Sequence, residues 1–396
     1  MDEGISARLD RNVVDIGLLS PFEKLSVASE AVPEDLLSLW RFCSFYGVRP
    51  AFVQAVGLKG ISSAQTSNIP TEPATFMRAH AFYVLQKLSE IAMLSRAFCS
   101  ENISAVFFKG AMLGEQIYSG AHCREFNDVD LLVDPVKQHK AEELLAALGY
   151  SPVVADVKFR RAFFDHQGQH MFRNKSTGTV VDLHWSFAGQ LHFPVSPSEV
   201  LYNRETRLIG DTMVPVPCAE DLALILAGHG QKEGWASFGW ALDFAQFAAK
   251  FPDFDWSHAV ERAYGNGSLR AVLTAAVIVE ALFGHEIDKG LVEKARAQGR
   301  IVEDVKRIVS GYHALASRKL EDDLMGSFRL TETPQQRLKA ALSLLLRPTI
   351  GDYEALPLRR TWWWLYRFTR PFRLVWQTTL GKHPTTSVFF EQQKGT

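Results

Sequence analysis

The feature that most constrains the fold of this 396-residue chain is the short run at residues 128–133, Asp-Val-Asp-Leu-Leu-Val. Its valines and leucines favour a β-strand, in which successive side chains point to opposite faces. The carboxylates of Asp128 and Asp130 therefore project to the same side. Two such charges repel each other unless a cation lies between them, which makes the pair a natural ligand for Mg²⁺.

Two neighbouring segments bear on the alternative interpretation, a solvated edge strand that carries two acids by chance. Upstream, the β-prone residues 104–108 end at Lys109 and Gly110, which predicts a strand followed by a glycine turn. Downstream, Asp182 lies in the β-prone residues 179–184. Three acids on adjacent strands are harder to explain by chance, and paired carboxylates suit a two-metal phosphoryl-transfer site with ions about 3.5–4 Å apart. We therefore predict a metal site here.

Strand and helix patterns alternate in this part of the chain. Residues 111–118 predict a short helix, and residues 136–148 predict an amphipathic helix that ends at Gly149, because glycine readily adopts the left-handed conformation found after helix ends. Further β-like runs follow at residues 159–164, 170–173 and 179–184. Apolar side chains at helical spacing occupy residues 33–56, 76–99 and 219–347. The expected fold class is α+β, a small mixed sheet with flanking helices, a helical N-terminal lead-in and a helical C-terminal domain.

Charge and cysteine content narrow the classes of function. Lys and Arg number 43 against 44 Asp and Glu, so the chain lacks the overall basic charge typical of nucleic-acid-binding proteins. The four cysteines are scattered singly, which predicts reduced thiols in a cytoplasmic protein. We expect neither a secretory signal nor a transmembrane segment, because the N-terminus is acidic and no run of about 18 residues is apolar throughout.

Sequence motifs of several other enzyme classes are absent. The chain contains no GxSxG, HExxH, Walker A or GxGxxG motif. The hydrolase, zinc-protease, P-loop and dinucleotide-binding classes of function therefore lack the residues that their chemistry requires.

Around the paired acids the sequence resembles the bacterial uncharacterised nucleotidyltransferases of the polymerase-β-like superfamily. The resemblance covers residues 80–250 and is carried by Phe108-Lys-Gly-Ala111, Leu113, Tyr118, Arg124, Asn127-Asp-Val-Asp-Leu-Leu-Val133, Gly149-Tyr150 and Val181-Asp-Leu-His-Trp185. Together with the patterns above it predicts four regions. These are a helical N-terminal region (1–75), a nucleotidyltransferase core (76–205), a helical domain (206–346) and a basic aromatic tail (347–396).

The resemblance implies a catalytic and metal-binding role for the three acids. Asp128 and Asp130 would hold two Mg²⁺ ions, with Mn²⁺ as the alternative metal, and Asp182 would complete the metal site and help to deprotonate the attacking hydroxyl. Gly110 would let the backbone approach the nucleotide phosphates closely. The superfamily usually has Gly-Ser or Gly-Gly at this turn, whereas this chain has Lys109, whose charge would neutralise the triphosphate.

Three further side chains are predicted to bind the nucleotide. Arg124 could clamp a phosphate, with a solvated loop arginine as the alternative. His184 shares the strand face of Asp182 and could orient that carboxylate or contact substrate, with a core histidine bonded to the backbone as the alternative. Lys232 shares a helix face with His229 and could reach the phosphates from a closing helix, with a surface lysine beside a capping histidine as the alternative.

The implied activity is transfer of a nucleoside monophosphate from a nucleoside triphosphate such as ATP to an acceptor hydroxyl or phosphate, with release of pyrophosphate. The acceptor is left open between a small molecule, a peptide and an RNA end. Two alternatives also stay open. One is phosphoryl transfer to a peptide or protein at the same metal site, and the other is a non-catalytic module that binds a nucleotide or docks on a partner.

The C-terminal segment has a distinct composition. Between residues 359 and 382 there are six basic residues and no acidic residue, interleaved with tryptophan, tyrosine and phenylalanine. Such a segment suits an interfacial helix on an anionic membrane or a docking face for a protein partner. It also suits a helix packed on the body of the protein with its arginines extended outward, which is the arrangement we expect.

Overall fold

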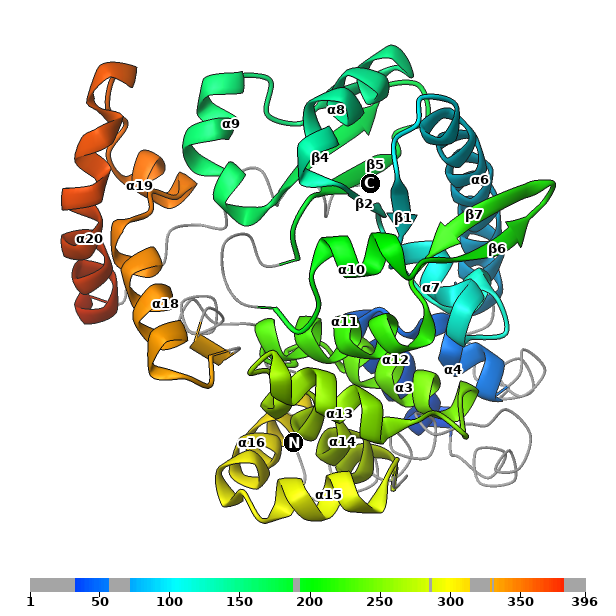
Figure 1. The fold of residues 1–396 in the computed structure, drawn as a ribbon. Helices are drawn as coiled ribbons and strands as arrows, with labels where there is room; N and C mark the ends of the chain where they lie inside the picture. The colour runs from blue at the N-terminus through cyan, green and yellow to red at the C-terminus, as the bar shows by residue number, and fades with distance from the viewer. Residues whose placement is uncertain are drawn as a thin grey trace.

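The computed structural model describes residues 33–56, 72–187, 193–284, 287–313, 328–329 and 331–380. In this part of the chain one five-stranded mixed sheet packs with two sets of helices, and a further group of helices lies at one side (Figure 1). The α+β fold class expected from the sequence is confirmed. The region predicted at residues 1–75 and the end of the tail lie partly outside the described residues, and the division into four regions stays a prediction.

The sheet has the strand order β1-β2-β5-β4-β3, in which β2 and β5 are parallel and the other neighbours are antiparallel. Its strands are β1 (Ala105–Phe107), β2 (Val129–Val133), β3 (Tyr150–Pro152), β4 (Gln169–Asn174) and β5 (Val180–His184). Every residue of β2 and β5 is buried. A strand covered on both faces favours a continuous apolar run, as at Leu131, Leu132 and Val133. The acids of these strands therefore interrupt an apolar core and need partners.

The register between β2 and β5 brings together residues that are far apart in the sequence. Asp130 lies opposite Asp182, and Leu132 lies opposite His184. Because side chains alternate along both strands, Asp130, Asp182 and His184 face the same side of the sheet. Asp128 lies one residue before β2, so it stands at the edge of this arrangement rather than within the strand.

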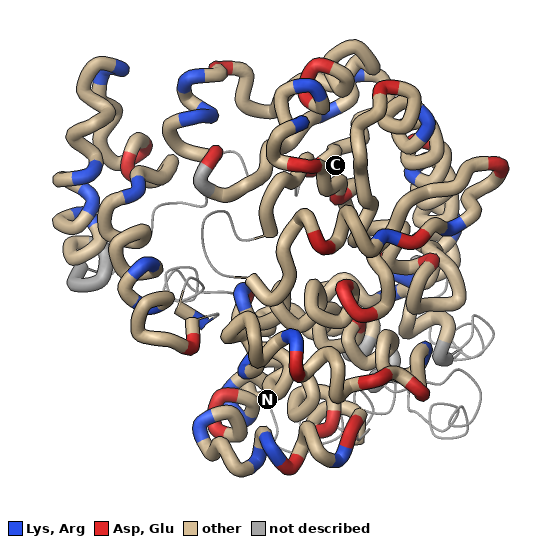
Figure 2. The backbone as a smooth tube through the Cα atoms, viewed as in Figure 1, with Lys and Arg blue, Asp and Glu red and all other residues tan. Residues whose placement is uncertain are grey.

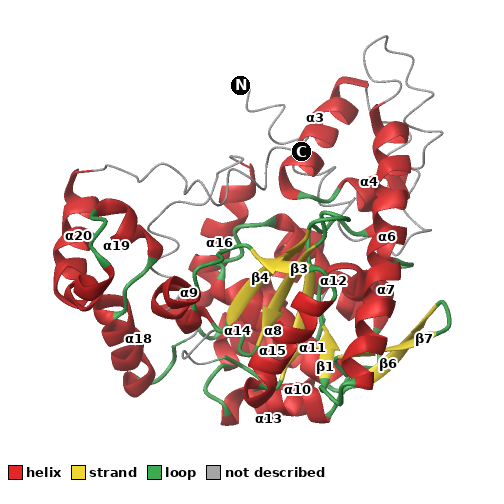
Figure 3. Ribbon diagram, turned by 90° about the horizontal axis from the view of Figure 1, so that it is seen from above, coloured by secondary structure: helices red, strands yellow, loops and turns green. Residues whose placement is uncertain are grey.

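Three helices pack around the sheet, and hydrogen bonds among buried polar side chains join the longest of these helices to the sheet. They are α6 (Glu72–Ser100), α7 (Gly110–Ile117) and α8 (Gln138–Ala147), visible together in Figure 3. The Tyr150 hydroxyl donates to Glu90 Oε1 at 2.7 Å, and the buried Lys87 donates to the Thr179 hydroxyl. The Thr179 hydroxyl in turn donates to Glu90, so α6 is joined to β3 and to the start of β5.

A second set of helices forms the lower half of the molecule in Figure 1. They are α3 (Pro33–Tyr46), α4 (Arg49–Val56), α11 (Ala219–Lys232), α12 (Phe238–Lys250), α13 (Trp256–Gly265), α14 (Leu269–Phe283), α15 (Lys289–Arg296) and α16 (Gly299–His313). Helix α14 lies at the centre, packed against α11, α12, α15 and α16, and its residues 271–279, Leu282 and Phe283 are buried. The same apolar core continues to the sheet through Val106 and Leu132. Burial of this shared core therefore fixes the helices against the sheet.

The prediction of a β-like run at residues 159–164 is wrong, because these residues belong to helix α9 (Val157–Phe163). Asp156 caps this helix by accepting from the backbone N–H groups of Lys158 and Phe159. The rings of Phe159 and Trp363 lie 5.7 Å apart, so the helix is also held by residues about two hundred positions away. No local pattern reveals that contact.

A helix and a β-hairpin lie in residues 194–217, a stretch with four prolines for which the sequence predicted no helix or strand. They are α10 (Pro197–Tyr202), β6 (Glu205–Ile209) and β7 (Thr212–Val216). Ser196 and Glu199 form a capping box at the start of α10. Strand β7 packs against α6 and β1 and buries Val214 and Val216, so tertiary packing overrides the unfavourable Pro215 between them.

The helices after residue 331, which we call the C-terminal lobe (residues 331–380), pack on α9. They are α18 (Pro334–Leu346), α19 (Ile350–Ala355), the 3-10 helix η4 (Arg360–Leu365) and α20 (Tyr366–Leu380). The Phe163 ring contacts the rings of Trp363 and Tyr366, and Arg360 pairs with Asp156 at 2.7 Å. Part of the aromatic segment is therefore packed on the body, as expected. The expectation that its arginines extend outward does not hold for Arg370, which is buried and pairs with Asp352. Neither these helices nor any other described helix is long and apolar enough to cross a membrane.

Candidate active site

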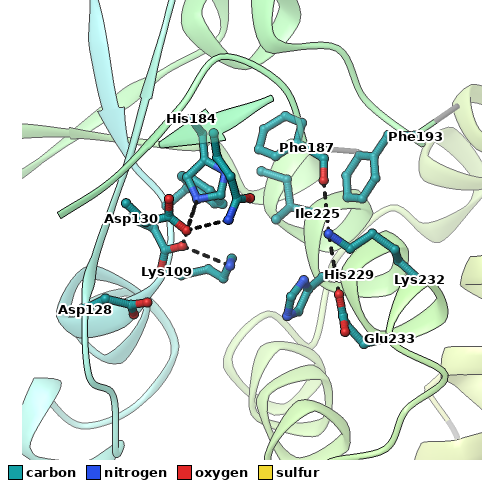
Figure 4. A pocket seen from close by; sticks show the side chains of 13 residues that line it. Lys109, Asp128, Asp130, His184, Phe187, Phe193, Ile225, His229, Lys232 and Glu233 are labelled. Carbon is teal, nitrogen blue, oxygen red and sulfur yellow. Dashed lines mark hydrogen bonds and ion pairs between the residues drawn. The ribbon is translucent and has the colours of Figure 1, made fainter. Parts of the chain in front are cut away.

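A pocket of about 150 Å³ lies between the sheet and helix α11 (Figure 4). The wall on the sheet side, which we call the sheet wall, is formed by Phe108, Lys109, Asp128, Asp130, Gln169, Asp182 and His184. The opposite wall, which we call the helix wall, is formed by Phe187, Phe193, Ile225, His229, Lys232 and Glu233. Six of the eight predicted site residues thus line one cavity: Lys109, Asp128, Asp130, Asp182, His184 and Lys232. The other two, Gly110 and Arg124, do not line it.

Three buried side chains on the sheet wall are close enough to share one ligand. The candidate metal-ligating atoms of Asp130, Asp182 and His184 lie within 4.8 Å of one another. His184 Nε2 is 3.2 Å from Asp130 Oδ1 and 3.2 Å from Asp182 Oδ2. Gln169 Nε2 donates to Asp182 Oδ2 at 2.8 Å. We call Asp130, Asp182 and His184 together the acidic cluster.

Lys109 and His184 compensate the charge of Asp130. Lys109 Nζ donates to Asp130 Oδ1 at 3.0 Å. Burial alone would raise the pKa of Asp130, but the positive charges of Lys109 and His184 outweigh it and hold that pKa well below its usual range. Burial of His184 opposes its protonation, but the negative charges of Asp182 and Asp130 favour it more strongly. The pKa of His184 is therefore raised to about 9. Asp130 is therefore a carboxylate at neutral pH.

Asp128 lies in the same pocket with a different electrostatic environment. Burial and the negative charge of Asp130 raise the pKa of Asp128 to about 7, and Lys109 only partly offsets them. Asp128 is outside the group of atoms that lie within 4.8 Å of one another. Without further positive charge in the pocket, Asp130 therefore loses its proton at a lower pH than Asp128 does.

The unpaired atoms of the acidic cluster fit a divalent cation. Asp182 Oδ1 is a buried acceptor with no hydrogen-bond partner among the described residues. His184 Nδ1 is also buried without a partner, and it becomes an acceptor when the imidazole loses its proton. Burying an unpaired acceptor is unfavourable, so such an atom is suited to bind a ligand. Carboxylate oxygens are the ligands that Mg²⁺ prefers in proteins, and Mn²⁺ accepts both carboxylate and imidazole. The donor set of Asp130, Asp182 and His184, with Asp128 beside it, therefore suits a metal of this kind.

Gly110 is required by the close approach of two backbone segments. Its φ is +55°, a left-handed conformation that glycine adopts without steric cost. A Cβ atom at this position would lie 2.8 Å from the carbonyl oxygen of Asp128. The turn after β1 thus rests directly on the segment that carries the paired acids, and Lys109 is placed beside Asp130 as a result.

Arg124 joins the sheet to the helical part of the molecule. Its Nε and Nη2 atoms each donate to one carboxylate oxygen of Asp243 at 2.9 Å, and the Tyr118 hydroxyl donates to Asp243 Oδ1 at 2.8 Å. This bidentate pair is the strong geometry for an arginine and a carboxylate. The three residues link the segment around the short 3-10 helix η1 (Ala121–Cys123) to α12.

Helix α11 stays continuous through two glycines and presents His229 and Lys232 to the pocket. A Cβ atom at Gly228 would lie 2.7 Å from Pro194, and one at Gly230 would lie 2.5 Å from the Trp235 ring, so these glycines permit close packing against the helix. Burial lowers the pKa of His229 well below its usual value and also lowers the pKa of Lys232. Positive charge is therefore unfavourable on this wall unless a negative ligand is present.

Five pocket residues were not predicted from the sequence: Gln169, Phe187, Phe193, Ile225 and Glu233. Among them, Glu233 Oε1 lies 3.4 Å from Lys232 Nζ. Gln169 reaches Asp182 because β4 is antiparallel to β5, with Gln169 opposite His184. Nothing in the local sequence signals this pairing, which depends on the order of strands in the sheet.

A small mixed sheet with flanking helices, which presents carboxylates from adjacent strands to a pocket that contains lysines, is the arrangement of a nucleotidyltransferase. A family model described as uncharacterised nucleotidyltransferase matches residues 33–284, well over half of the chain, and the protein belongs to this family. The family implies a nucleoside triphosphate donor and transferase activity.

Comparisons with individual proteins add little to this assignment. No curated protein matches the chain. Solved structures with some similarity include the crystal structure of an antigenic nucleotidyltransferase-like protein from Paracoccidioides brasiliensis. It has 18% sequence identity and a TM-score of 0.30, and the match covers 50% of this chain and 96% of that chain. No conclusion rests on a similarity of this size.

Proposed function

We propose that the protein is a metal-dependent enzyme that transfers a nucleoside monophosphate from a nucleoside triphosphate to an acceptor hydroxyl or phosphate, with release of pyrophosphate. The observation that carries this proposal is the matched register of Asp130 and Asp182 on parallel neighbouring strands. Both carboxylates face a pocket whose walls also hold Lys109 and Lys232. Nucleotidyl transfer requires negative charge to hold a metal and positive charge to hold the phosphates.

We assign metal binding to Asp128, Asp130 and Asp182, with His184 as an additional ligand or as the group that orients the two carboxylates. The metal is Mg²⁺ in this proposal, with Mn²⁺ as the alternative. Bound there, it supplies Lewis-acid polarisation of the phosphate oxygens and neutralises their charge. The unpaired Asp182 Oδ1 supports this assignment. In the same proposal Asp182 also helps to deprotonate the attacking hydroxyl.

Lys109 and Lys232 are proposed to hold the triphosphate from opposite sides. Lys109 is paired with Asp130, and Lys232 with Glu233, so each has a carboxylate partner that an anionic ligand can replace. The cavity of about 150 Å³ is smaller than the roughly 300–1,000 Å³ typical of ligand sites. We therefore assign it to the phosphates and the metal, and the nucleoside extends beyond it.

Two of the predicted nucleotide contacts have a different role in this proposal. Arg124 acts as a positioning residue, because its guanidinium is occupied by Asp243. Gly110 acts by letting the turn before α7 rest on the carbonyl of Asp128. The acceptor remains open between a small molecule, a peptide and an RNA end. A cytoplasmic location is proposed on the basis of the four free cysteines, which suit a reducing compartment.

The first test is calorimetric titration of each of the four ribonucleoside triphosphates into the protein, with and without Mg²⁺. We expect metal-dependent binding by the wild type and its loss in the Asp128→Asn/Asp130→Asn double variant. Product analysis then identifies the reaction, because pyrophosphate marks nucleotidyl transfer and a nucleoside diphosphate marks phosphoryl transfer. Binding that does not depend on metal or on the two acids would contradict the proposed site.

A further inference from the structure

Helix α20 in the C-terminal lobe has one buried and one exposed face. The buried face carries Tyr366, Arg370 and Leu374, at a spacing of four residues. The exposed face of α20 carries Phe368 and Phe372, which are 63% and 78% exposed, and it is extended by Trp364 of the preceding helix η4, which is 58% exposed. We call the surface formed by these three side chains the outer face. Trp364 and Phe368 lie on the same side, since their ring centroids are 6.1 Å apart. Residues four apart share one side of a helix, so the outer face is a continuous aromatic strip.

This concentration of exposed aromatic side chains is confined to one part of the molecule. Of the nine tryptophans, the three that are exposed all belong to the C-terminal lobe: Trp362, Trp364 and Trp376. Scattered apolar residues on a surface are normal, whereas a contiguous patch marks an interaction site. The lobe also lies outside residues 33–284, which match the nucleotidyltransferase family. Its exposed surface is therefore separate from the pocket and from the family core.

The lobe is strongly basic. Its basic residues are Arg337, Lys339, Arg347, Arg359, Arg360, Arg367, Arg370 and Arg373, and its acidic residues are Glu332, Asp352 and Glu354 (Figure 2). Asp352 is buried and pairs with Arg370 and Arg373 at 2.6 Å, so its charge is already compensated. Arg367, which is next to Phe368 in the sequence, and Arg359, five residues before Trp364, are exposed. The surroundings of the aromatic strip therefore carry net positive charge.

We propose that the outer face of α20 docks on the surface of an anionic lipid bilayer. Tryptophan and phenylalanine are suited to the boundary between lipid headgroups and acyl chains, and arginines pair with the phosphates of anionic lipids. Each basic residue near such a surface contributes to the attraction. The proposed contact is with the bilayer surface, and no described helix is long and apolar enough to cross a membrane.

A second copy of the chain is a poorer occupant for the same surface. A symmetric contact through the outer face would bring Arg359 and Arg367 of one copy towards the same residues of the other. Since the segment from Ala355 to Leu380 contains no acidic residue, these charges would repel without compensation. An anionic bilayer provides both the apolar layer and the opposite charge.

The test is co-sedimentation of the full chain with vesicles of phosphatidylcholine alone and with vesicles of equal parts phosphatidylcholine and phosphatidylglycerol. We expect the wild type to bind the anionic vesicles at least about tenfold more tightly than the neutral ones. The Phe368→Ser/Phe372→Ser variant should lose at least about tenfold in binding, because two large apolar side chains are removed from the contact. Phe82→Ser/Leu85→Ser is the matched control, since these residues of α6 are 75% and 64% exposed, and it should bind as the wild type does.

A second variant, at Arg367, measures the contribution of positive charge to vesicle binding separately from that of the aromatic side chains. Arg367→Gln should weaken binding to the anionic vesicles by about fivefold and leave binding to neutral vesicles unchanged. Absence of binding to every vesicle, or equal losses in the α20 variant and the α6 control, would overturn the proposal. A wild-type dimer in sedimentation velocity that the Phe368→Ser/Phe372→Ser variant dissociates would also overturn it, by assigning the outer face to a second copy.

Discussion

The two walls of the pocket hold their charged groups in different ways. On the sheet wall, Asp130 and Asp182 each contact His184 at 3.2 Å, so the charges compensate one another within the protein. On the helix wall, Lys232 has longer contacts, 3.4 Å to Glu233 Oε1 and 3.4 Å to the Phe187 carbonyl oxygen, and burial lowers its pKa. The sheet wall is therefore pre-organised, whereas the helix wall gains most of its electrostatic stabilisation when an anionic ligand is bound.

The largest expected effect is on the sheet wall, at the centre of the acidic cluster. Asp130→Asn should lower the rate of nucleotidyl transfer by about 10³-fold or more, because loss of a metal-holding carboxylate removes several kcal/mol of charge stabilisation in the transition state. The measurement is pyrophosphate release, with Asp253→Asn as the control, since Asp253 is exposed and outside the pocket. An unchanged rate in Asp130→Asn would remove the basis for placing catalysis on the sheet wall.

The second prediction tests whether the sheet wall depends on the close contact at Gly110. Gly110→Ala should destabilise the protein by about 1–2 kcal/mol for the left-handed conformation and by a further 1–3 kcal/mol or so for overlap with the Asp128 carbonyl. Gly149→Ala is the matched control, because Gly149 has a φ of +86° and an added Cβ would meet nothing within 4 Å. Chemical denaturation of both variants measures the difference. Equal losses would mean that the contact with Asp128 is not important.

The third prediction addresses the helix wall. Lys232→Met should weaken binding of the triphosphate by about 10-fold to 100-fold, since one charge-assisted contact contributes about 1.5–3 kcal/mol. The effect should fall on KM more than on kcat, in contrast to Asp130→Asn. Lys250→Met, at an exposed position at the end of α12, is the control. If donor affinity is the same in Lys232→Met and in the control, the two walls do not share the ligand.

The smallest effect concerns the pH dependence of stability at Asp128, measured without metal. Because burial and Asp130 raise the pKa of Asp128 to about 7, the folded state binds more protons than the unfolded state between pH 4 and 7 or so, and stability falls as the pH rises through that window. Asp128→Asn removes this penalty and should stabilise the protein on the order of 1 kcal/mol at pH 8, with little effect near pH 4. Thermal unfolding across this pH range measures it. Destabilisation at pH 8 would show that Asp128 is favourably paired.

Local sequence patterns predicted the elements whose structure depends on local preference. The strands around the acids and the helices at residues 111–118 and 136–148 were recognised from β-prone runs, helical spacing and a final glycine, and they form β2, β5, α7 and α8. Helix α9 (Val157–Phe163) was missed although Asp156 is a local N-cap residue, because the helix is also stabilised by aromatic contacts with the C-terminal lobe. Whether such a segment forms a helix is decided by its contacts with segments that are distant in the sequence.

By itself the sequence predicted which acids would carry the chemistry, and it determined that side chains two apart on a strand share a face, because alternation is a property of the local backbone. Only the tertiary structure decided that Asp130 lies opposite Asp182, that Lys232 faces them across the pocket, and that Arg124 pairs with Asp243 instead. It also decided which side of α20 is buried. Register, facing walls and buried faces follow from the packing of distant segments, whose apolar burial no local pattern specifies.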